Sequence, residues 1–463
     1  MIKNQELEIE NSVVSMISYG FANMSRRLVL VTFTTWIIFF YEVEIGLQTW
    51  FIEIGIMIFI IYNAIIGILI GYSTNRPFVF TPKLGRRFLL ILIGGIPLGV
   101  CLFLFFSMDP IGSAWILFTY FVILLILFDT FHTLFSVNYH ALFPDKFRSL
   151  NDRRVVSGIY VFLGYMGVIL SAFITSLIIV FGDLTSYRIM GFIILVLFIF
   201  FFGIGIPGVR EKQITKDLYL ASIHEKAENR SFFRTIGTVF TQKSFIGFLI
   251  FFILFQIAFT SVMTSLLYVI RYVYELPYMV LLPLYIAMVI GIIIGVQFWP
   301  LMAFVTNNNR KIMLISAALA GVSLIPLFIL RGFITIVIFM YIWGFALGGI
   351  YSMILPVVSD IIDESIVKTQ KREEGIYFGI QQFIGRLALI IQAIIFTLVL
   401  SLTGFSSEPF KRQSPSAVLG IFLNLAGLPM VFILIGTLLF WILYDIKPEK
   451  VEENRLRIQE LNL

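Results

Sequence analysis

Long apolar segments recur along the whole chain, and short polar segments separate them. A helix rises about 1.5 Å per residue, so about 20 apolar residues cross a hydrocarbon core about 30 Å thick. These runs are too long for the strands of a membrane barrel, and backbone groups in lipid must be satisfied within their own segment. Twelve segments therefore predict an all-α integral membrane protein: 12–41, 50–73, 88–107, 113–143, 155–182, 189–208, 244–270, 278–304, 312–330, 335–358, 375–403 and 417–445.

Basic residues gather in alternate connections between these segments. If both termini are cytoplasmic, the five inside connections carry 20 Lys and Arg residues and the six outside connections carry 5. Cytoplasmic loops of membrane proteins carry such an excess of basic residues. We therefore expect a multi-pass protein of the plasma membrane with both termini in the cytoplasm.

The longest interior polar stretch, residues 209–243, divides the twelve segments into two sets of six. Transporters built from two six-helix halves have this layout and hold their substrate near the midplane between the halves. We expect an N-terminal six-helix bundle over 1–208, a cytoplasmic central loop over 209–243, a C-terminal six-helix bundle over 244–445 and a cytoplasmic tail over 446–463.

Two short basic segments occupy equivalent positions in the two predicted halves. "KLGRR" (83–87) follows the second apolar segment, and "NNNRK" (307–311) follows the eighth. Basic residues are common after a cytoplasmic helix end, so this internal echo is weak by itself.

Composition agrees with a membrane protein and gives little support to an enzyme. The chain is 59% hydrophobic and 13% charged, whereas a soluble domain carries about a quarter charged residues. The net charge of +6 comes from short loops, so it indicates topology rather than nucleic-acid binding. Only three histidines occur, and no metalloprotease, nucleophile-elbow or phosphate-loop motif is present. We expect no catalytic residues, no metal and no cofactor.

Two adjacent arginines lie inside the first apolar segment. Leu28–Tyr41 is too short to cross a membrane, so the helix has to extend backward through Arg26 and Arg27. An ionised side chain deep in a bilayer is a candidate functional group. We expect Arg27 to face the bundle interior and Arg26 to reach cytoplasmic water. The alternative is that both arginines cap a helix that starts at Leu28.

A third arginine lies eleven residues into the eleventh segment. Arg386 stands in "GIQQFIGRLALIIQAIIF", one helical turn after Gln382, and uninterrupted apolar sequence follows it. The sequence favours a substrate-binding or gating role for Arg386, with a structural ion pair as the alternative.

The fourth segment carries an acid deep inside an apolar span. Asp129, His132 and Ser136 recur at i, i+3 and i+7, which places them on one helix face. Histidine titrates near neutral pH, so the pair of Asp129 and His132 suits proton transfer. Neutralisation of Arg27 or Arg386 by Asp129 is an equally open interpretation.

Five segments, in order along the chain, are similar to known transporter motifs. "GYSTNR…KLGRR" (71–87) resembles the second loop motif of the major facilitator superfamily. Four others resemble the glycoside–pentoside–hexuronide:cation symporters, the melibiose permease family. They are "SYGFA" (18–22), "NYHALFPDKFRSLNDRR" (138–154), "SDIIDESIVKTQKREEGIYFG" (359–379) and "QSPSAVLGI" (413–421). The resemblance implies the major facilitator fold, with two pseudo-symmetric halves, and transport by alternating access.

The resemblance also implies that the sodium chemistry of the family has changed. "NAIIG" (63–67) stands where sugar–sodium members carry two carboxylates one turn apart, so Asn63 and Gly67 are degenerate cation-site equivalents. A cation normally needs several oxygen ligands. We therefore expect proton-coupled or uncoupled transport.

Sugar-contacting positions of the family carry other residue types here. The resemblance places Arg27 and Ser136 at sugar-binding aspartates, Tyr160 at an arginine and Arg386 at a lysine. The reversal of charge at Arg27 favours an anionic or zwitterionic solute. The predicted substrate site is Tyr19, Asn23, Arg27, Asp129, His132, Ser136, Tyr160, Gln382 and Arg386.

Charged residues of both signs at the predicted cytoplasmic end form a candidate gate. The set is Arg76, Arg86, Arg87, Arg154, Asp360 and Asp363. Salt bridges among such residues would latch one state of a transporter. The alternative is a solvated, positively charged fringe, in which each exposed pair contributes under about 1 kcal/mol.

Together these observations predict a secondary transporter for a small polar solute, such as a sugar derivative, a uronate or another anionic or zwitterionic solute. Its partners would be that solute and the lipid bilayer, with no nucleic acid, and we expect a monomer. Two alternatives stay open: a non-transporting sensor or scaffold that keeps the fold, and a lysolipid-type transporter of the same family.

Overall fold

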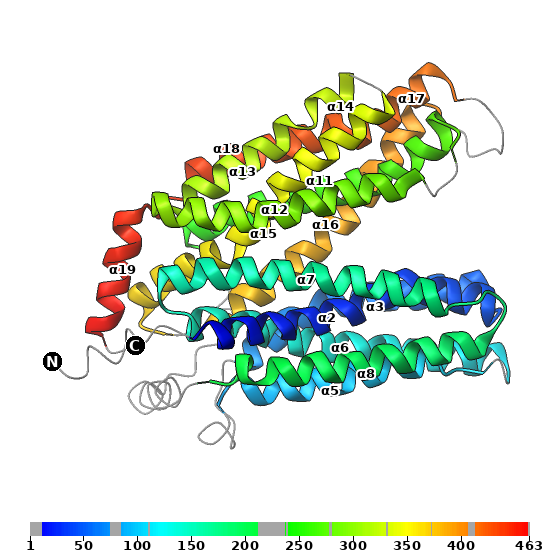
Figure 1. The fold of residues 1–463 in the computed structure, drawn as a ribbon, viewed down its shortest axis with the longest axis horizontal. Helices are drawn as coiled ribbons and strands as arrows, with labels where there is room; N and C mark the ends of the chain where they lie inside the picture. The colour runs from blue at the N-terminus through cyan, green and yellow to red at the C-terminus, as the bar shows by residue number, and fades with distance from the viewer. Residues whose placement is uncertain are drawn as a thin grey trace. The chain divides into compact units, whose positions relative to one another are not determined.

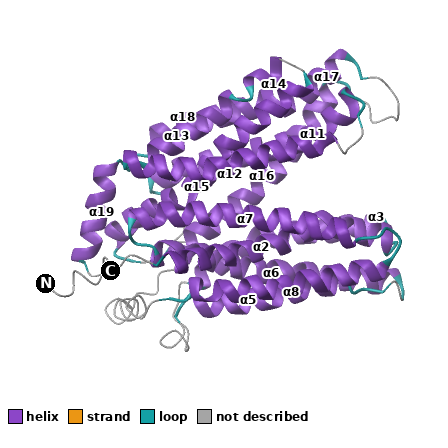
Figure 2. Ribbon diagram, in the orientation of Figure 1, coloured by secondary structure: helices purple, strands orange, loops and turns teal. Residues whose placement is uncertain are grey.

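The structure is a computed structural model. It describes residues 12–74, 85–109, 112–211, 237, 239–276, 280–329, 332–371, 373–405 and 413–461, without the side chains of Thr49, Ala64 and Ile68. Every regular element in these ranges is a helix (Figure 2). Arg76 and most of the predicted central loop lie outside the described residues.

Each of the twelve predicted segments corresponds to a helix or to consecutive helices. The first six are α2 (Val13–Phe39) with the π-helical turn η2 (Phe40–Glu44), α3 (Thr49–Ser73), α5 (Phe88–Phe105), α6 (Ala114–Lys146), α7 (Leu150–Ile178) and α8 (Leu184–Val209). The others are α11 (Lys243–Tyr268) with η3 (Val269–Val273), α12 (Leu281–Thr306), α13 (Asn309–Val322) with α14 (Ile325–Ile329), α15 (Phe333–Thr369), α16 (Glu374–Leu402), and α17 (Pro415–Phe422) with η5 (Leu423–Gly427) and α18 (Leu428–Leu443). A last helix, α19 (Pro448–Glu460), follows them.

Eleven helices of the described chain are long and apolar enough to cross a membrane. The one predicted span outside this set is the first, α2, which carries Arg26 and Arg27 near its middle. The predicted all-α membrane fold is confirmed.

Several helices continue beyond their apolar segment. The tenth segment was expected over 335–358, whereas α15 continues to Thr369. Polar groups support this extension, because Lys368 donates to Glu364 one turn earlier at 2.9 Å. Hydropathy marks only the part of a helix that lies in lipid, so it underestimates the length of helices that protrude.

The chain divides into two compact units. Unit 1 comprises Met1–Asn229, Lys371–Phe383 and Leu461–Leu463, and unit 2 comprises Arg230–Gln370 and Ile384–Glu460. The helix α16 therefore begins in unit 1 and continues in unit 2.

In unit 1, α2 packs against α7 and α8, α5 packs against α6 and α8, and α3 packs against α6 (Figure 1). The contact between α8 and α2 is very close. A Cβ on Gly208 would overlap the backbone at Tyr19, and the Gly208 N–H donates to Ser18 Oγ at 2.8 Å. Small residues allow helices in membranes to approach in this way.

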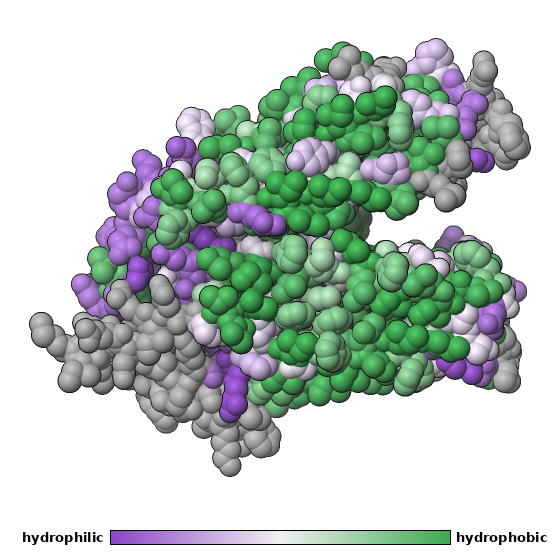
Figure 3. Space-filling view, in the orientation of Figure 1, coloured by the Kyte–Doolittle hydropathy of each residue, from purple (hydrophilic) through white to green (hydrophobic). Residues whose placement is uncertain are grey.

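In unit 2, α12 packs against α15, α11 against α18, and α13 against both α15 and α18, while α19 packs against α15. The crossing of α12 and α15 is again close, because a Cβ on Gly344 would overlap the carbonyl of Met288. Apolar side chains cover the visible flank of each unit, and strongly polar residues collect near the helix ends (Figure 3). This distribution suits helices that face lipid along their length.

Candidate functional site

Polar side chains of α2, α6 and α7 form a hydrogen-bonded cluster inside unit 1. Arg26 Nη2 donates to Asn23 Oδ1 at 2.8 Å, and Asn23 Nδ2 donates to the carbonyl of Tyr160 on α7 at 2.8 Å. Arg26 Nη1 lies 3.4 Å from His132 Nε2 on α6. The three helices therefore converge on one guanidinium group.

This guanidinium is buried without a counter-ion. Arg26 is 5% exposed, and its partners Asn23 and His132 are both uncharged when His132 is neutral. Among the described residues no carboxylate lies within ion-pair distance of Arg26, and its Nε atom has no hydrogen-bond partner. The expectation that Arg26 reaches cytoplasmic water is wrong.

Arg27 is the more exposed of the two arginines. It is half-buried, and the base of its side chain lies beside Gly164 and Gly167 of α7. Successive residues of a helix point about 100° apart, so only one of the two arginines can face His132. Packing of α2 gives that place to Arg26.

The cluster continues on the other side of Tyr160. The Tyr160 hydroxyl lies 2.9 Å from His140 Nε2, and His140 Nδ1 lies 3.5 Å from Ser136 Oγ. Gln382 Nε2, at the start of α16, donates to Ser136 Oγ at 2.9 Å. His140 was not predicted as a site residue, although its i+4 spacing from Ser136 was visible in the sequence.

Asp129 of α6 contacts Asn63, one of the two positions predicted to be degenerate cation-site equivalents. Asn63 Nδ2 of α3 donates to Asp129 Oδ1, and Tyr62 of α3 and Thr130 of α6 form a second hydrogen bond of 2.7 Å. The shared face predicted for Asp129, His132 and Ser136 thus contacts three helices in turn: α3, α2 and α16.

Gly67 belongs to a close helix crossing. A Cβ on Gly379 of α16 would lie 2.7 Å from the Gly67 carbonyl, and a Cβ on Gly71 would overlap the carbonyl of Gly375. Both helices carry glycines four residues apart at this contact, which lets their backbones touch. Position 67 therefore serves contact between α3 and α16.

Tyr19 has a packing role. Its side chain is fully buried, its hydroxyl donates to the Tyr139 carbonyl at 2.8 Å, and Tyr139 returns the same bond to Tyr19 at 2.7 Å. The two rings stack with centroids 4.3 Å apart. This reciprocal pair joins α2 to α6 and leaves the Tyr19 hydroxyl occupied.

The remaining predicted substrate residue, Arg386, belongs to unit 2 and is half-buried on α16. Two predicted gate residues also belong to unit 2. Asp360 is buried and accepts from Asn309 Nδ2 at 3.0 Å, and Asp363 is half-buried. Arg154, in unit 1, is buried.

Arg86 and Arg87 form a buried ion-pair cluster in unit 1. Arg86 Nη2 lies 3.0 Å from Asp145 Oδ2 and 2.9 Å from Glu374 Oε2, while Arg87 Nη2 lies 3.4 Å from Glu374 Oε2. Arg87 is 0% exposed and Arg86 is 4% exposed. The alternative of a solvated fringe is therefore wrong for this pair, and Glu374 ties the start of α16 to α5 and α6.

Among the described residues, no group of three or more His, Cys, Asp or Glu side chains is arranged to hold a metal ion. Asp129 and His132 lie on the same face of α6, but they bind different neighbours, Asn63 and Arg26. The expectation that the protein needs no metal or cofactor stays a prediction.

Comparison with known proteins identifies the family. A family model described as "MFS/sugar transport protein" matches residues 18–447. The fold is similar to that of the major facilitator superfamily proton:xylose symporter XylE bound to 6-bromo-6-deoxy-D-glucose, with a TM-score of 0.65 and 13% sequence identity over 95% of this chain and 98% of that chain. None of the curated proteins compared with the chain matches its sequence. Since the family model spans nearly the whole chain, this multi-pass membrane protein belongs to the MFS/sugar transport protein family of the major facilitator superfamily.

Proposed function

We propose that the protein is a secondary transporter of the melibiose permease-like branch. It carries a small polar solute with an anionic group, such as a uronate or another sugar acid, across the plasma membrane by alternating access. One observation carries the proposal: a guanidinium buried between α2 and α6 with no carboxylate partner among the described residues.

A buried cation without a counter-ion is costly. Ionised groups inside a membrane protein cost several kcal/mol unless they pair with an opposite charge or face water. A carboxylate on the solute would supply the missing charge and accept two N–H bonds from one guanidinium. Arg26 Nε is buried and has no hydrogen-bond partner among the described residues, so the guanidinium keeps one donor that no protein group satisfies.

The neutral part of the cluster suits the rest of such a solute. Tyr160, His140 and Ser136 present hydroxyl and imidazole groups that both donate and accept, which is what sugar hydroxyls require. Arg27 and Arg386 remain predicted additional contacts, and the cluster of Arg86, Arg87 and Glu374 is the proposed gate.

Proton coupling is the proposed energy source. Asp129 is a buried acid on the same face of α6 as His132 and Ser136, and it accepts a hydrogen bond from the neutral amide of Asn63. Protonation would neutralise Asp129 and weaken its hydrogen bond with Asn63. Binding of a proton would therefore change the contact between α6 and α3. One amide and one carboxylate, Asn63 and Asp129, offer fewer oxygen ligands than a cation site normally has.

Uptake into liposomes tests the proposal. Purified protein is reconstituted and given matched pairs that differ only in one carboxylate: glucose and glucuronate, or galactose and galacturonate. We expect faster uptake of the uronates under an inward proton gradient and no stimulation by a sodium gradient. Sodium-driven uptake would contradict the proposed coupling, and the absence of uptake for every solute would contradict a transport function of this kind.

The variant Asp129→Asn tests the coupling separately. It removes the titratable group but keeps a side chain of the same size, so uptake driven by a pH gradient should fall about tenfold or more while solute exchange continues. Asp109→Asn is the matched control, because Asp109 is exposed and pairs with Arg188 at a helix end. Equal loss of driven uptake in both variants would argue against Asp129 as the proton carrier.

A further inference from the structure

The carboxylate of Glu211, more than 120 residues further along the chain, binds the backbone of the turn that carries Arg86 and Arg87. Glu211 Oε2 accepts from the backbone N–H of Arg86 at 2.7 Å, and Glu211 Oε1 accepts from the backbone N–H of Arg87 at 2.8 Å. These N–H groups lie directly before α5, and backbone N–H groups at the start of a helix have no partner within the helix. A negative charge is also favourable at a helix N-terminus.

The two hydrogen bonds between Glu211 and the turn, here called the Glu211 clamp, require glycine at position 85. Its φ is +91°, a left-handed conformation that glycine adopts readily. A Cβ built on Gly85 would overlap the Glu211 carboxylate. A side chain at position 85 would therefore be strained in φ and would collide with the carboxylate that holds the turn.

The side chains of the same turn reach forward to the proposed gate. Arg86 pairs with Asp145 and Glu374, and Arg87 Nη1 donates to Asn138 Oδ1 at 3.1 Å as well as approaching Glu374. The carboxylate of Glu211 thus fixes the backbone from which both guanidinium groups extend.

The chain on the other side of Glu211 is also held. Glu211 follows the last residue of α8 by two positions, and Lys146 Nζ donates to the carbonyls of Pro207 and Arg210 at 3.3 and 3.2 Å. Lys146 is the neighbour of Asp145, the partner of Arg86. The end of α8, the start of α5 and the end of α6 are therefore joined in one buried charge cluster.

We propose that Glu211 is a positioning residue for the gate: it transmits the position of the chain after α8, where the predicted central loop begins, to the contact of Arg86 and Arg87 with Glu374. The inference rests on the proposed gate and adds to it a control point outside the membrane-spanning segments. Glu211 is 8% exposed, so little water competes with its two hydrogen bonds, and burial raises the pKa of its carboxyl against the lowering effect of the Arg87 and Arg86 N–H bonds and the Arg86 charge.

Labelling of one cysteine tests this inference without any solute. Cys101 is the single cysteine of the chain, so Cys101→Ala with Phe378→Cys leaves one thiol, on the α16 turn that follows Glu374. Phe378 is 2% exposed and lies against His140. Its reactivity with a soluble maleimide reports release of the start of α16 from its contacts with α5 and α6.

We expect Glu211→Ala to raise the labelling rate about tenfold, which corresponds to about 1.4 kcal/mol. Glu374→Gln should raise it by a similar factor, and the double variant should be no faster than Glu374→Gln alone, because Glu211 acts through the arginines. Glu211→Gln keeps the shape and one acceptor oxygen, so it should lie between the native protein and Glu211→Ala. The matched control is Glu453→Ala, an exposed glutamate on α19, which should label like the native protein.

Additive effects in the double variant would overturn the inference, since Glu211 would then act independently of Glu374. Native-like labelling of both Glu211 variants would overturn it as well. If Glu211→Ala does not fold, the same comparison of labelling rates is made with Glu211→Gln, alone and combined with Glu374→Gln. Liposome uptake by the native protein is a separate readout, so failure of the proposed transport does not change the labelling result.

Discussion

The first helix of unit 1 and the first helix of unit 2 end in the same backbone turn. α2 ends in η2, where the Ile45 N–H donates to the Phe40 carbonyl at 2.9 Å, and α11 ends in η3, where the Tyr274 N–H donates to the Val269 carbonyl at 3.0 Å. A residue of positive φ follows in each unit, Gly46 at +75° and Glu275 at +54°.

The interiors of these two helices differ sharply. Counted back from the two π-helical turns, Asn23 and Arg26 of α2 correspond to Phe252 and Phe255 of α11. Both phenylalanines are buried, so the same helix position holds hydrogen-bonding groups in one unit and packed rings in the other. Shared backbone geometry therefore coexists with a polar cluster that unit 1 builds on its first helix.

The turns before α5 and α13 repeat this contrast. Two residues after a position of positive φ, Arg87 donates to Asn138 in unit 1, and Asn309 donates to Asp360 in unit 2. The contact is the same, but unit 1 pairs a cation with an amide and unit 2 pairs an amide with an acid. The similarity between "KLGRR" and "NNNRK" thus corresponds to the same kind of helix start in both units, with different charged and polar groups in the contact.

The largest expected effect comes from making α2 resemble α11. Arg26→Phe places the unit 2 residue at the unit 1 position and removes the only charge of the polar cluster on α2, so uptake of an anionic solute should fall about 100-fold, which corresponds to about 2.7 kcal/mol. Uptake is measured in liposomes. The partner change, Phe255→Leu, keeps an apolar side chain and should reduce uptake less than about threefold; equal losses in the two variants would remove the proposed asymmetry.

A smaller effect is expected from the two helix-start contacts. Arg87→Ala leaves a buried Glu374 with one cation fewer, and removal of one partner of a buried ion pair costs about 3–5 kcal/mol. Asn309→Ala removes a neutral donor from Asp360, which costs about 1–3 kcal/mol. Thermal unfolding of the solubilised protein should therefore show a lower midpoint for Arg87→Ala than for Asn309→Ala, and the reverse order would contradict the comparison.

The smallest effect concerns acids that follow the sixth span of each unit by two residues. Glu211 follows α8 and is buried, and Asp445 follows α18 with a side chain that is 64% exposed. Burial dominates at Glu211 and raises its pKa. At Asp445 burial also raises the pKa, but the bonds from Ser244 and Lys450 outweigh it, and the pKa is lowered overall.

The two shifts have opposite consequences for stability. Folded Glu211 keeps its proton to a higher pH than the unfolded chain does, so its contribution is present below the ordinary carboxyl range and is lost as the pH rises through the raised pKa. The Asp445 contribution is present above that range and is lost as the pH falls through the lowered pKa. In pH-dependent unfolding, Glu211→Gln should flatten the mildly acidic region, and Asp445→Asn should change only the more acidic region, by under about 1 kcal/mol because the pair with Lys450 is exposed.

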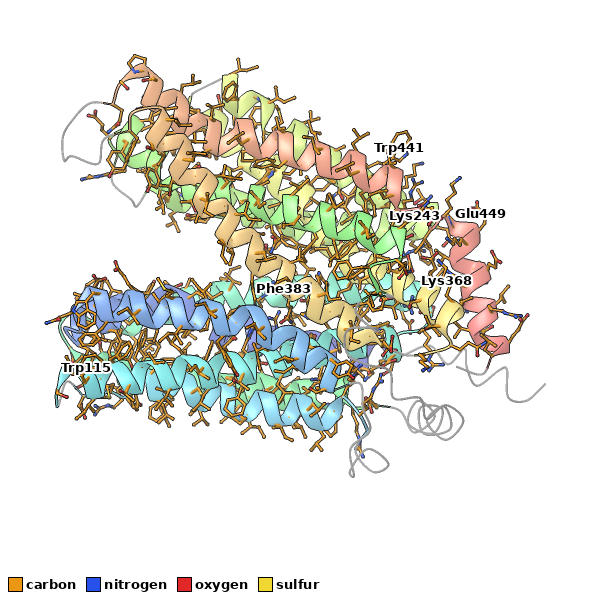
Figure 4. All side chains as sticks on the ribbon, turned by 180° about the vertical axis from the view of Figure 1, so that it is seen from behind. Trp115, Lys243, Lys368, Phe383, Trp441 and Glu449 are labelled. Carbon is orange, nitrogen blue, oxygen red and sulfur yellow. The ribbon has the colours of Figure 1, made fainter. Side chains whose placement is uncertain are left out.

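Lys243, Lys368, Trp441 and Glu449 lie at the same end of unit 2 (Figure 4). Glu364, a buried acid one helical turn before Lys368, accepts from Gln242 at 2.7 Å and pairs with Lys450 of α19 at 2.7 Å. Unit 2 thus also gathers buried polar contacts at a helix end, but it uses amides and lysines where unit 1 uses two arginines.

The sequence by itself determined the apolar spans, their order and the residues that would be exceptional in lipid. These are local properties, because the length of an apolar run and the cost of an ionised group in hydrocarbon do not depend on the partner helix. The superfamily followed from motifs spread along the chain, and the family model confirms it.

Tertiary structure alone decided which polar groups meet. Arg26 rather than Arg27 faces His132 because packing against α7 and α8 sets the rotation of α2, and one residue along a helix changes direction by about 100°. Asp129 and Asn63 are separated by 66 residues, and Glu211 lies 124 residues from Arg87. Contacts at such separations depend on helix packing, which periodicity and hydropathy do not contain.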